Sequence, residues 1–185
     1  NLEFLQLTST RYDLLNIALL EERGIVVAGV NDAVAKTAAT HVCTLIMELE
    51  AKLGYSKNVD SPSTVLADKT IGLIGLGRLG TEIARQTKEI FAQVRYMDVR
   101  TASQGVTNEL PLIRDTIDRM LIASDYVSVQ VPLTKQSRGL IDRREFSLIK
   151  SGAIFVNASH PDVLNRLDLL AALEYGELAG VGITY

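Results

Sequence analysis

The sequence predicts an α/β protein built on a doubly wound parallel sheet. Short runs rich in β-branched residues alternate with helical patterns along most of the 185 residues, with little sequence between them. Parallel strands need crossover connections, which are usually helices of right-handed sense. A sheet connected in this way carries helices on both faces. The length allows one full domain, or one domain and part of a second.

Composition and charge favour a protein that handles small molecules. Hydrophobic residues make up 47% and charged residues 22%, as in ordinary globular domains. The formal net charge of −3 comes without a long basic or acidic run, so we expect neither a nucleic-acid nor a membrane partner. The single cysteine, Cys43, has no internal disulfide partner, which favours the cytoplasm. With only two histidines, no transition-metal site is expected.

The first third of the chain predicts a βαβ unit and then a long helix. Gly24 ends the first helical pattern, and the second has apolar positions at Val42, Ile46 and Leu49. The polar segment 56–62 has the composition of a linker. The expected elements are a strand at 4–7, a helix at 14–22, a strand at 25–27 and a helix at 33–53.

From Lys69 onward, strands and helices alternate with short connections. The exception is the segment 98–115, which shows neither period and is expected to be irregular. The predicted strands lie at 71–74, 94–97, 126–131, 153–156 and 178–183, and the predicted helices at 79–90, 116–123, 142–149 and 165–175.

A glycine-rich loop follows the first of these strands and opens its helix. Residues 75–80 read G-x-G-x-x-G. Gly75 permits a tight turn, Gly77 removes the Cβ that would block a pyrophosphate, and Gly80 lets the helix approach the strand. The helix N-terminus offers N–H groups and a positive dipole end to phosphates, and Arg78 could add a charge. The order of strand, glycines and helix predicts a dinucleotide-binding Rossmann fold.

A carboxylate, Asp98, ends the next strand, about twenty residues after the loop. There it can accept hydrogen bonds from the adenosine ribose and repel a 2′-phosphate, so NAD is favoured over NADP. Arg100, two residues on, would soften that preference. The alternative is that residues 75–80 form only a tight strand-to-helix connection in a fold without nucleotide affinity.

Several stretches of the sequence carry recognisable motifs. They are D-K-T-I-G-L-I-G-L-G-R-L-G at 68–80, V-Q-V-P-L-T at 129–134 with R-G-L-I at 138–141, I-K-S-G-A-I-F-V-N at 149–157, and, upstream, residues 5–8, 12–13 and 23–25. Together, these stretches resemble D-isomer-specific 2-hydroxyacid dehydrogenases. The resemblance implies three parts. These are a remnant of a flavodoxin-like substrate lobe at 1–32, an interdomain helix and linker at 33–67, and the NAD-binding domain at 68–185.

The same resemblance implies functional residues and a partner. Toward the diphosphate and adenosine, it implies contacts from Gly75, Gly77, Arg78, Leu79, Gly80, Asp98, Val131 and Pro132. Toward the nicotinamide and its ribose, it implies contacts from Thr10, Ala158, Ser159 and His160. It also implies a homodimer through the helix at residues 33–53.

The residues that would carry chemistry depart from the family pattern. The family uses an arginine to bind and polarise the substrate, and a histidine paired with a glutamate as acid and base. His160 stands at the arginine position, and an imidazole cannot supply a bidentate fork. The acid–base pair would lie beyond Tyr185, and Thr184 replaces an aspartate that holds the nicotinamide amide. We therefore expect a domain that is incomplete or inactive by itself, with His160 as its catalytic candidate.

Two functions of different classes remain open at this point. One is an NAD-binding oxidoreductase domain that acts between nicotinamide and a 2-oxo or 2-hydroxy acid. The other is a non-catalytic NAD-binding module that serves as a sensor, a dimerisation unit or an interaction unit. Neither a G-x-S-x-G elbow nor a P-loop lysine occurs, so hydrolase and kinase functions have no support.

Overall fold

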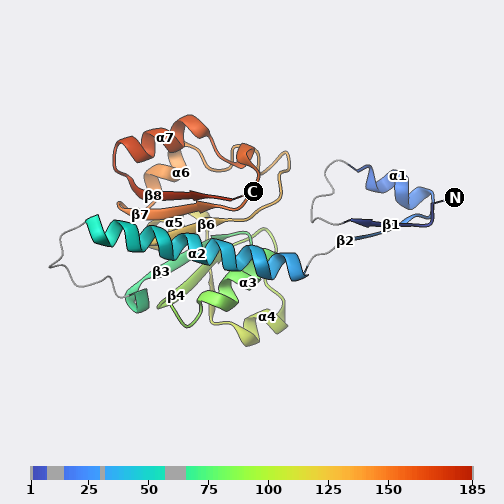
Figure 1. The fold of residues 1–185 in the computed structure, drawn as a ribbon, viewed down its shortest axis with the longest axis horizontal. Coiled ribbons are helices and arrows are strands. Elements are labelled where there is room, and N and C mark those ends of the chain that lie inside the picture. Colours follow the sequence, from blue (N-terminus) through green and yellow to red (C-terminus); the bar gives the residue numbers. More distant parts are fainter. Residues whose placement is uncertain (1, 8–14, 30–31, 57–65, 185) are drawn as a thin grey trace.

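The computed structural model describes residues 2–7, 15–29, 32–56 and 66–184 (Figure 1). Its main body is a six-stranded parallel sheet with the order β5-β4-β3-β6-β7-β8, which confirms the predicted fold class. Strand order reverses between β3 and β6, the position where open α/β sheets place ligands. The strands are β3 (Thr70–Ile74), β4 (Gln93–Met97), β5 (Leu112–Arg114), β6 (Tyr126–Val129), β7 (Ala153–Asn157) and β8 (Leu178–Ile183).

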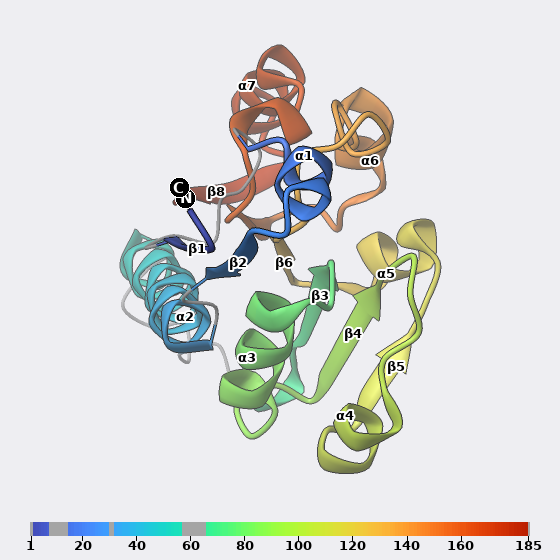
Figure 2. The ribbon, with the colours of Figure 1, turned by 90° about the vertical axis from the view of Figure 1, so that its right-hand side faces the viewer.

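Helices cover both faces of this sheet. Figure 2 shows two of them on one side, α2 (Asp32–Ser56) and α3 (Arg78–Thr87). The opposite face carries α5 (Ile117–Ala123), α6 (Arg143–Leu148) and α7 (Arg166–Glu174). One short helix, α4 (Gln104–Glu109), precedes β5, and 3₁₀ turns occur at Leu66–Asp68 and Pro161–Val163.

Each central strand is buried on both faces because its side chains alternate between two cores. In β7, Ile154 and Val156 pack with α2 and α3, whereas Phe155 packs with the helices of the opposite face. Phe155 meets Phe146 of α6 edge to face, with ring centroids 5.5 Å apart. Strands buried on both faces have mostly apolar sequences, and this pattern allowed them to be predicted.

The long helix α2 packs as part of the main body. Ala39, Val42 and Ile46 are fully buried between α2 and the sheet. Farther along the helix, Glu50 accepts a hydrogen bond from the Tyr126 hydroxyl at 2.8 Å, and burial raises the pKa of that hydroxyl well above its usual value. Burial also raises the pKa of Cys43 to about 11, which keeps its thiol protonated and unreactive.

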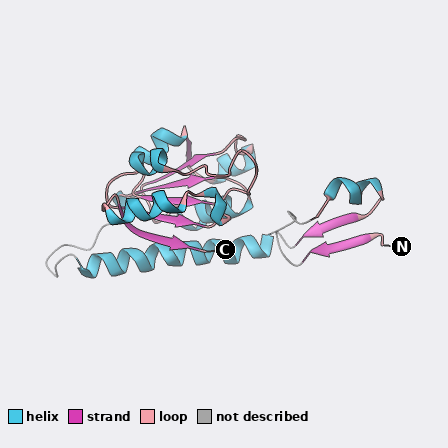
Figure 3. Cartoon of the chain, turned by 90° about the horizontal axis from the view of Figure 1, so that it is seen from above, coloured by secondary structure: helices cyan, strands magenta, loops and turns pink. Residues whose placement is uncertain are grey.

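A separate βαβ unit precedes α2. It consists of β1 (Phe4–Leu7), α1 (Ile17–Glu22) and β2 (Val26–Gly29), with β1 and β2 paired in parallel. Figures 1 and 3 show it beyond the amino end of α2 and apart from the main body. Phe4 and Val26 are directly paired, and both side chains are more than half exposed.

Some predicted elements differ from the structure. The expectation that 98–115 is irregular was wrong, because the segment holds α4 and β5. Elements of six and three residues are too short to show a period, and β5 is an edge strand with two exposed residues. The first helix begins at Ile17, where Asn16 caps it by accepting from Leu19 N–H at 3.1 Å. Ser56 belongs to α2, and the rest of the expected linker lies outside the described residues.

A charge cluster lies at the amino edge of the sheet. Asp125, just before β6, accepts hydrogen bonds from Lys150 Nζ at 2.8 Å and from the Thr70 N–H at 3.0 Å. Burial alone would raise the pKa of Asp125. The hydrogen bonds and the charges of Lys69 and Lys150 outweigh burial, so this pKa lies below its ordinary value.

Because the folded-state pKa of Asp125 is lowered, its stabilisation is fully present above the unfolded pKa of about 3.9 and is lost as the pH falls through the lower folded-state pKa. We expect Asp125→Asn to lower the free energy of unfolding by about 1–2 kcal/mol at pH 7 and by less near pH 3. Urea denaturation at both pH values measures the difference. Asp118→Asn, which removes an exposed ion-pair partner of Arg144, is the control and should change stability little at either pH. An equal loss at pH 7 and pH 3 would contradict the charge assignment.

No helix in the described ranges has both the length and the apolar character needed to cross a membrane.

Candidate functional site

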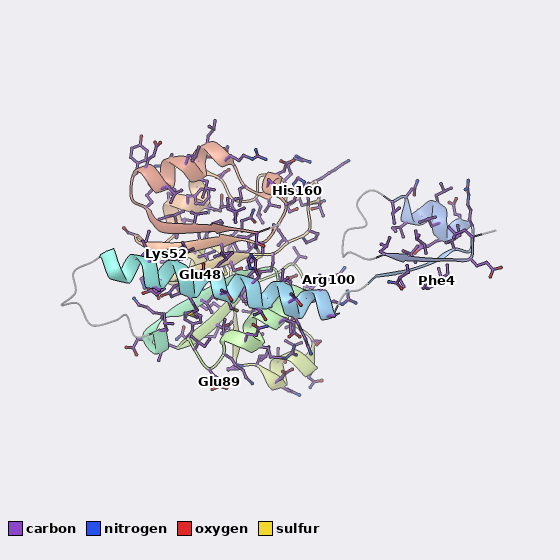
Figure 4. All side chains as sticks on the ribbon, viewed as in Figure 1. Phe4, Glu48, Lys52, Glu89, Arg100 and His160 are labelled. Carbon is purple, nitrogen blue, oxygen red and sulfur yellow. The ribbon has the colours of Figure 1, made fainter. Side chains whose placement is uncertain are left out.

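The candidate site lies at the carboxyl edge of the sheet. Because the strands are parallel, the loops that follow β3, β4, β6 and β7 leave from this one edge. Figure 4 shows Arg100, after β4, and His160, after β7, toward the same end of the main body. The predicted site residues within the described ranges lie on these four loops and on the first turn of α3. Thr10 lies outside the described residues.

The three glycines of the loop after β3 have different surroundings. Gly75 has φ +97°, and a Cβ there would lie 2.9 Å from Val131 Cγ1. A Cβ on Gly80 would lie 2.1 Å from the carbonyl oxygen of Gly75, so only a residue without a Cβ lets α3 approach the loop this closely. A Cβ on Gly77 would meet nothing within 4 Å. Two glycines therefore serve the protein's own packing, and the third leaves space beside the loop.

The amino end of α3 faces that space. Gly77 is the N-cap, and no side chain caps the helix. The first backbone hydrogen bond of the helix runs from Thr81 N–H to Gly77 O at 2.9 Å. The amide groups of the first turn carry the positive end of the helix dipole, which suits an anion with several oxygens. The glycine loop and this helix end fit a diphosphate.

Asp98 lies directly beside the glycine loop. Its Oδ2 accepts a hydrogen bond from Leu76 N–H at 2.7 Å, and its Oδ1 accepts from Arg100 N–H at 2.8 Å. Each carboxylate oxygen keeps a further lone pair for a ligand hydroxyl. Arg114 lies close by and donates to the backbone oxygen of Asp98 at 3.2 Å and to Thr101 Oγ1 at 2.9 Å. A sugar diol next to the diphosphate position would meet the carboxylate, with Arg100 on the same loop and Arg114 at the end of β5.

The loop after β6 lies against the glycine loop. The side chain of Val131 packs against Gly75, and its N–H donates to Ser159 Oγ at 2.8 Å, which ties this loop to the one after β7. Pro132 is exposed, and its carbonyl accepts from Ser137 Oγ at 2.6 Å. Ala158 N–H donates to Val129 O at 2.8 Å. Ser159 is buried, so its hydroxyl holds the two loops together rather than standing free in the site.

His160 caps the 3₁₀ turn that follows β7. Its Nδ1 accepts a hydrogen bond from Asp162 N–H at 3.1 Å, which places the proton of the neutral ring on Nε2. Arg138 forms an ion pair with Asp162 and holds the pKa of that carboxyl below its usual value. The imidazole can therefore donate one hydrogen bond through Nε2, and it offers no bidentate fork.

Asn157, at the end of β7, carries an unpaired donor. Its Oδ1 accepts from Ser159 N–H at 3.0 Å, while Nδ2 is the one buried side-chain polar atom of the described residues without a hydrogen-bond partner. Such orphaned groups are rare in folded proteins. An acceptor for Nδ2 would have to come from a group outside the described residues.

Gln130 is a site residue that sequence reasoning missed. Its Nε2 donates to the Gly75 carbonyl at 2.6 Å, and its Oε1 accepts from Ser128 Oγ at 2.8 Å. A signal was present, because Ser128 and Gln130 are polar residues at alternate positions of an otherwise apolar run. Alternate positions share a face, and polar groups in a strand buried on both sides need partners.

The described ranges contain no group of three or more histidine, cysteine, aspartate or glutamate side chains arranged to hold a metal ion. The groups described above can bind an anion and a diol, and His160 can donate a hydrogen bond at one end.

Comparison with known proteins agrees with this geometry. Residues 35–183 match the family described as "D-isomer specific 2-hydroxyacid dehydrogenase, NAD binding domain". A glyoxylate reductase of Thermococcus gammatolerans is 29% identical, over 93% of this chain and 56% of that protein. The putative 2-hydroxyacid dehydrogenase YoaD of Bacillus subtilis is 37% identical, over 62% of this chain and 32% of that protein.

Solved structures show the same fold. D-lactate dehydrogenase with NAD⁺ from Lactobacillus jensenii has a TM-score of 0.83 at 26% identity, covering 98% of this chain and 57% of that chain. The apo D-mandelate dehydrogenase of Rhodotorula graminis has a TM-score of 0.80 at 24% identity. The chain spans about half the length of the curated relatives it matches. Because the family match covers most of the chain, the resemblance is confirmed, and the chain belongs to the NAD-binding domain family of D-isomer-specific 2-hydroxyacid dehydrogenases.

Proposed function

We propose that this chain is the coenzyme-binding part of an NAD-dependent oxidoreductase that transfers a hydride between nicotinamide and a 2-oxo or 2-hydroxy acid. The observation that carries the proposal is the contact between Leu76 N–H and Asp98 Oδ2 at 2.7 Å. It brings the diphosphate-binding loop and the sugar-binding carboxylate together at the sheet's switch point. The non-catalytic alternative is less favoured, because the relatives that match are named as reductases and dehydrogenases.

In this proposal, the adenosine diphosphate half of NAD lies along the glycine loop, Asp98 and the loop of Val131 and Pro132. The nicotinamide half lies toward Ala158, Ser159 and His160. The His160 Nε2–H would donate a hydrogen bond to a substrate oxygen. The substrate, the acid–base groups and any activity are proposed for the whole protein. This chain covers 56% of the matching glyoxylate reductase and 57% of the matching D-lactate dehydrogenase.

Calorimetric titration with NADH tests the binding part of the proposal, and binding in the micromolar range is the expected result. NADH oxidation in the presence of glyoxylate, pyruvate and other 2-oxo acids tests the activity. An absence of NADH binding by the folded chain would refute the proposal as a whole. Binding without turnover would restrict this chain to the cofactor role.

Cofactor choice should depend on the charge of Asp98. Asn at this position can still accept from Leu76 N–H, but it no longer repels a 2′-phosphate, and Arg100 and Arg114 are nearby. We expect Asp98→Asn to reduce the preference for NADH over NADPH by about tenfold or more. The ratio of the two dissociation constants measures the change. Glu89→Gln removes the same charge from an exposed position away from Arg100 (Figure 4) and should leave the ratio unchanged. An unaltered ratio in Asp98→Asn would contradict the role of the carboxylate.

We also infer the following organisation. Residues 1–32 are part of a substrate lobe, 33–67 are an interdomain helix and linker, and 68–185 bind NAD. The homodimer would form through the exposed face of α2, which includes Thr40, Thr44 and Glu48. Sedimentation equilibrium of the chain tests the dimer. A cytoplasmic location is supported by the presence of one cysteine only in the 185 residues.

A further inference from the structure

The peptide unit between Gly75 and Leu76 is held at both of its ends by side chains from neighbouring strands. Its carbonyl oxygen, on Gly75, accepts from Gln130 Nε2 at 2.6 Å. Its N–H, on Leu76, donates to Asp98 Oδ2 at 2.7 Å. Gln130 follows β6 and Asp98 follows β4, and these are the two strands that flank β3 in the sheet. Side chains that follow the two strands adjacent to β3 thus form hydrogen bonds with the two ends of one peptide.

This peptide needs such support because glycine precedes it. Gly75 has φ +97°, and glycine places little steric restriction on rotation of the following peptide plane. The amide groups of the next residues lead into the first turn of α3. Rotation of the plane would therefore change where those groups point. Two hydrogen bonds of opposite polarity at the two ends select a single orientation.

Gln130 is itself held in a fixed orientation. Its Oε1 accepts from Ser128 Oγ at 2.8 Å, so the NH₂ group of the amide faces Gly75. Ser128 is fully buried and Gln130 is 9% exposed. A buried glutamine with both of its polar atoms engaged is a rigid donor, because releasing either bond would leave an unpaired buried group.

We propose that Gln130 is a positioning residue of the dinucleotide site, which sets the orientation of the 75–76 peptide together with Asp98 and so keeps the loop amides aimed at the diphosphate. The role rests on the proposed NAD-binding function. Gln130 acts through the loop and need not touch the cofactor. The pairing also means that Asp98 has two roles, one toward the loop and one toward the sugar.

Substitutions at Gln130 and Ser128 test this role. Gln130→Met keeps the length of the side chain and removes its hydrogen bonds, and Gln130→Glu keeps the shape but places an acceptor against the Gly75 carbonyl. Ser128→Ala removes only the support of the amide. The control is Gln136→Met, at an exposed position on the same loop. Thermal melting verifies that each variant is folded.

Two readouts are required. The first is the ¹⁵N–¹H resonance and hydrogen exchange of the Leu76 amide without any cofactor. Its signal should shift, and its exchange should accelerate, in both Gln130 variants. The second is the NADH dissociation constant from fluorescence titration. We expect increases of about threefold for Ser128→Ala, about tenfold for Gln130→Met and more for Gln130→Glu, with no change for Gln136→Met.

The outcomes separate this inference from the proposed function. If the unaltered chain binds NADH, and folded Gln130→Met leaves both the Leu76 amide and the dissociation constant unchanged, the positioning role is overturned while the proposed function stands. If the unaltered chain fails to bind NADH, both are overturned, whatever the Leu76 amide does. If Gln130→Met does not fold, the Ser128→Ala variant tests the positioning role instead. An unmoved Leu76 amide and unchanged affinity in that variant would overturn the role.

Discussion

Gly77→Ala is expected to raise the NADH dissociation constant by about a hundredfold or more, which corresponds to about 2.8 kcal/mol of binding free energy. The added Cβ would project into the open space beside the loop, where nothing of the protein lies within 4 Å. In the proposed complex, that space holds the diphosphate, and the methyl group would displace it from the amides of the α3 N-terminus.

The same substitution should leave the fold intact. Gly77 has φ −72° and ψ −163°, a conformation open to alanine, and replacing glycine by alanine at an N-cap changes stability by less than about 1 kcal/mol. Fluorescence titration and thermal melting together check both halves of the prediction. Gly105→Ala, at an equally open position in α4, is the matched control and should bind NADH as the unaltered chain does. Normal NADH affinity in folded Gly77→Ala would contradict the proposed position of the diphosphate beside this loop.

Gly80→Ala is expected to destabilise the fold by about 3 kcal/mol or more. Alanine is ordinarily the better residue inside a helix, by up to about 1 kcal/mol. Here its Cβ would lie 2.1 Å from the Gly75 carbonyl oxygen and 3.3 Å from Gln130 Nε2. The steric overlap outweighs the helix preference because the contact is with backbone, and relief requires that α3 move away from the loop.

Urea denaturation measures this loss, and Gly105→Ala again provides the contrast. In α4, the same change meets no neighbour, so it should be neutral or stabilise the protein by a few tenths of a kcal/mol. Equal effects at Gly80 and Gly105 would mean that the close approach of α3 to the loop does not exist in solution. The two substitutions, three residues apart in one motif, are thus expected to have different effects. Gly77→Ala should weaken NADH binding, and Gly80→Ala should destabilise the fold.

Local patterns were sufficient where each element is long and apolar. The strands β3 and β7 were each predicted in nearly their observed positions, because a strand buried on both faces leaves a nearly unbroken apolar run. The elements α4 and β5 left no such pattern, since they are short and lie at the sheet's edge. His160 was located correctly as a loop residue. Its engagement as a cap through Nδ1 depends on a turn that only the folded loop reveals.

The fold class, the family and the position of the glycine loop could be predicted from the sequence, because these depend on residues close together along the chain. The folded chain was needed to see which glycine is crowded and which is open, and that Gln130 and Asp98 bind the two ends of one peptide. Those contacts join residues 55 and 22 positions apart. Strand order and register bring such residues together, and no local period in the sequence encodes that order.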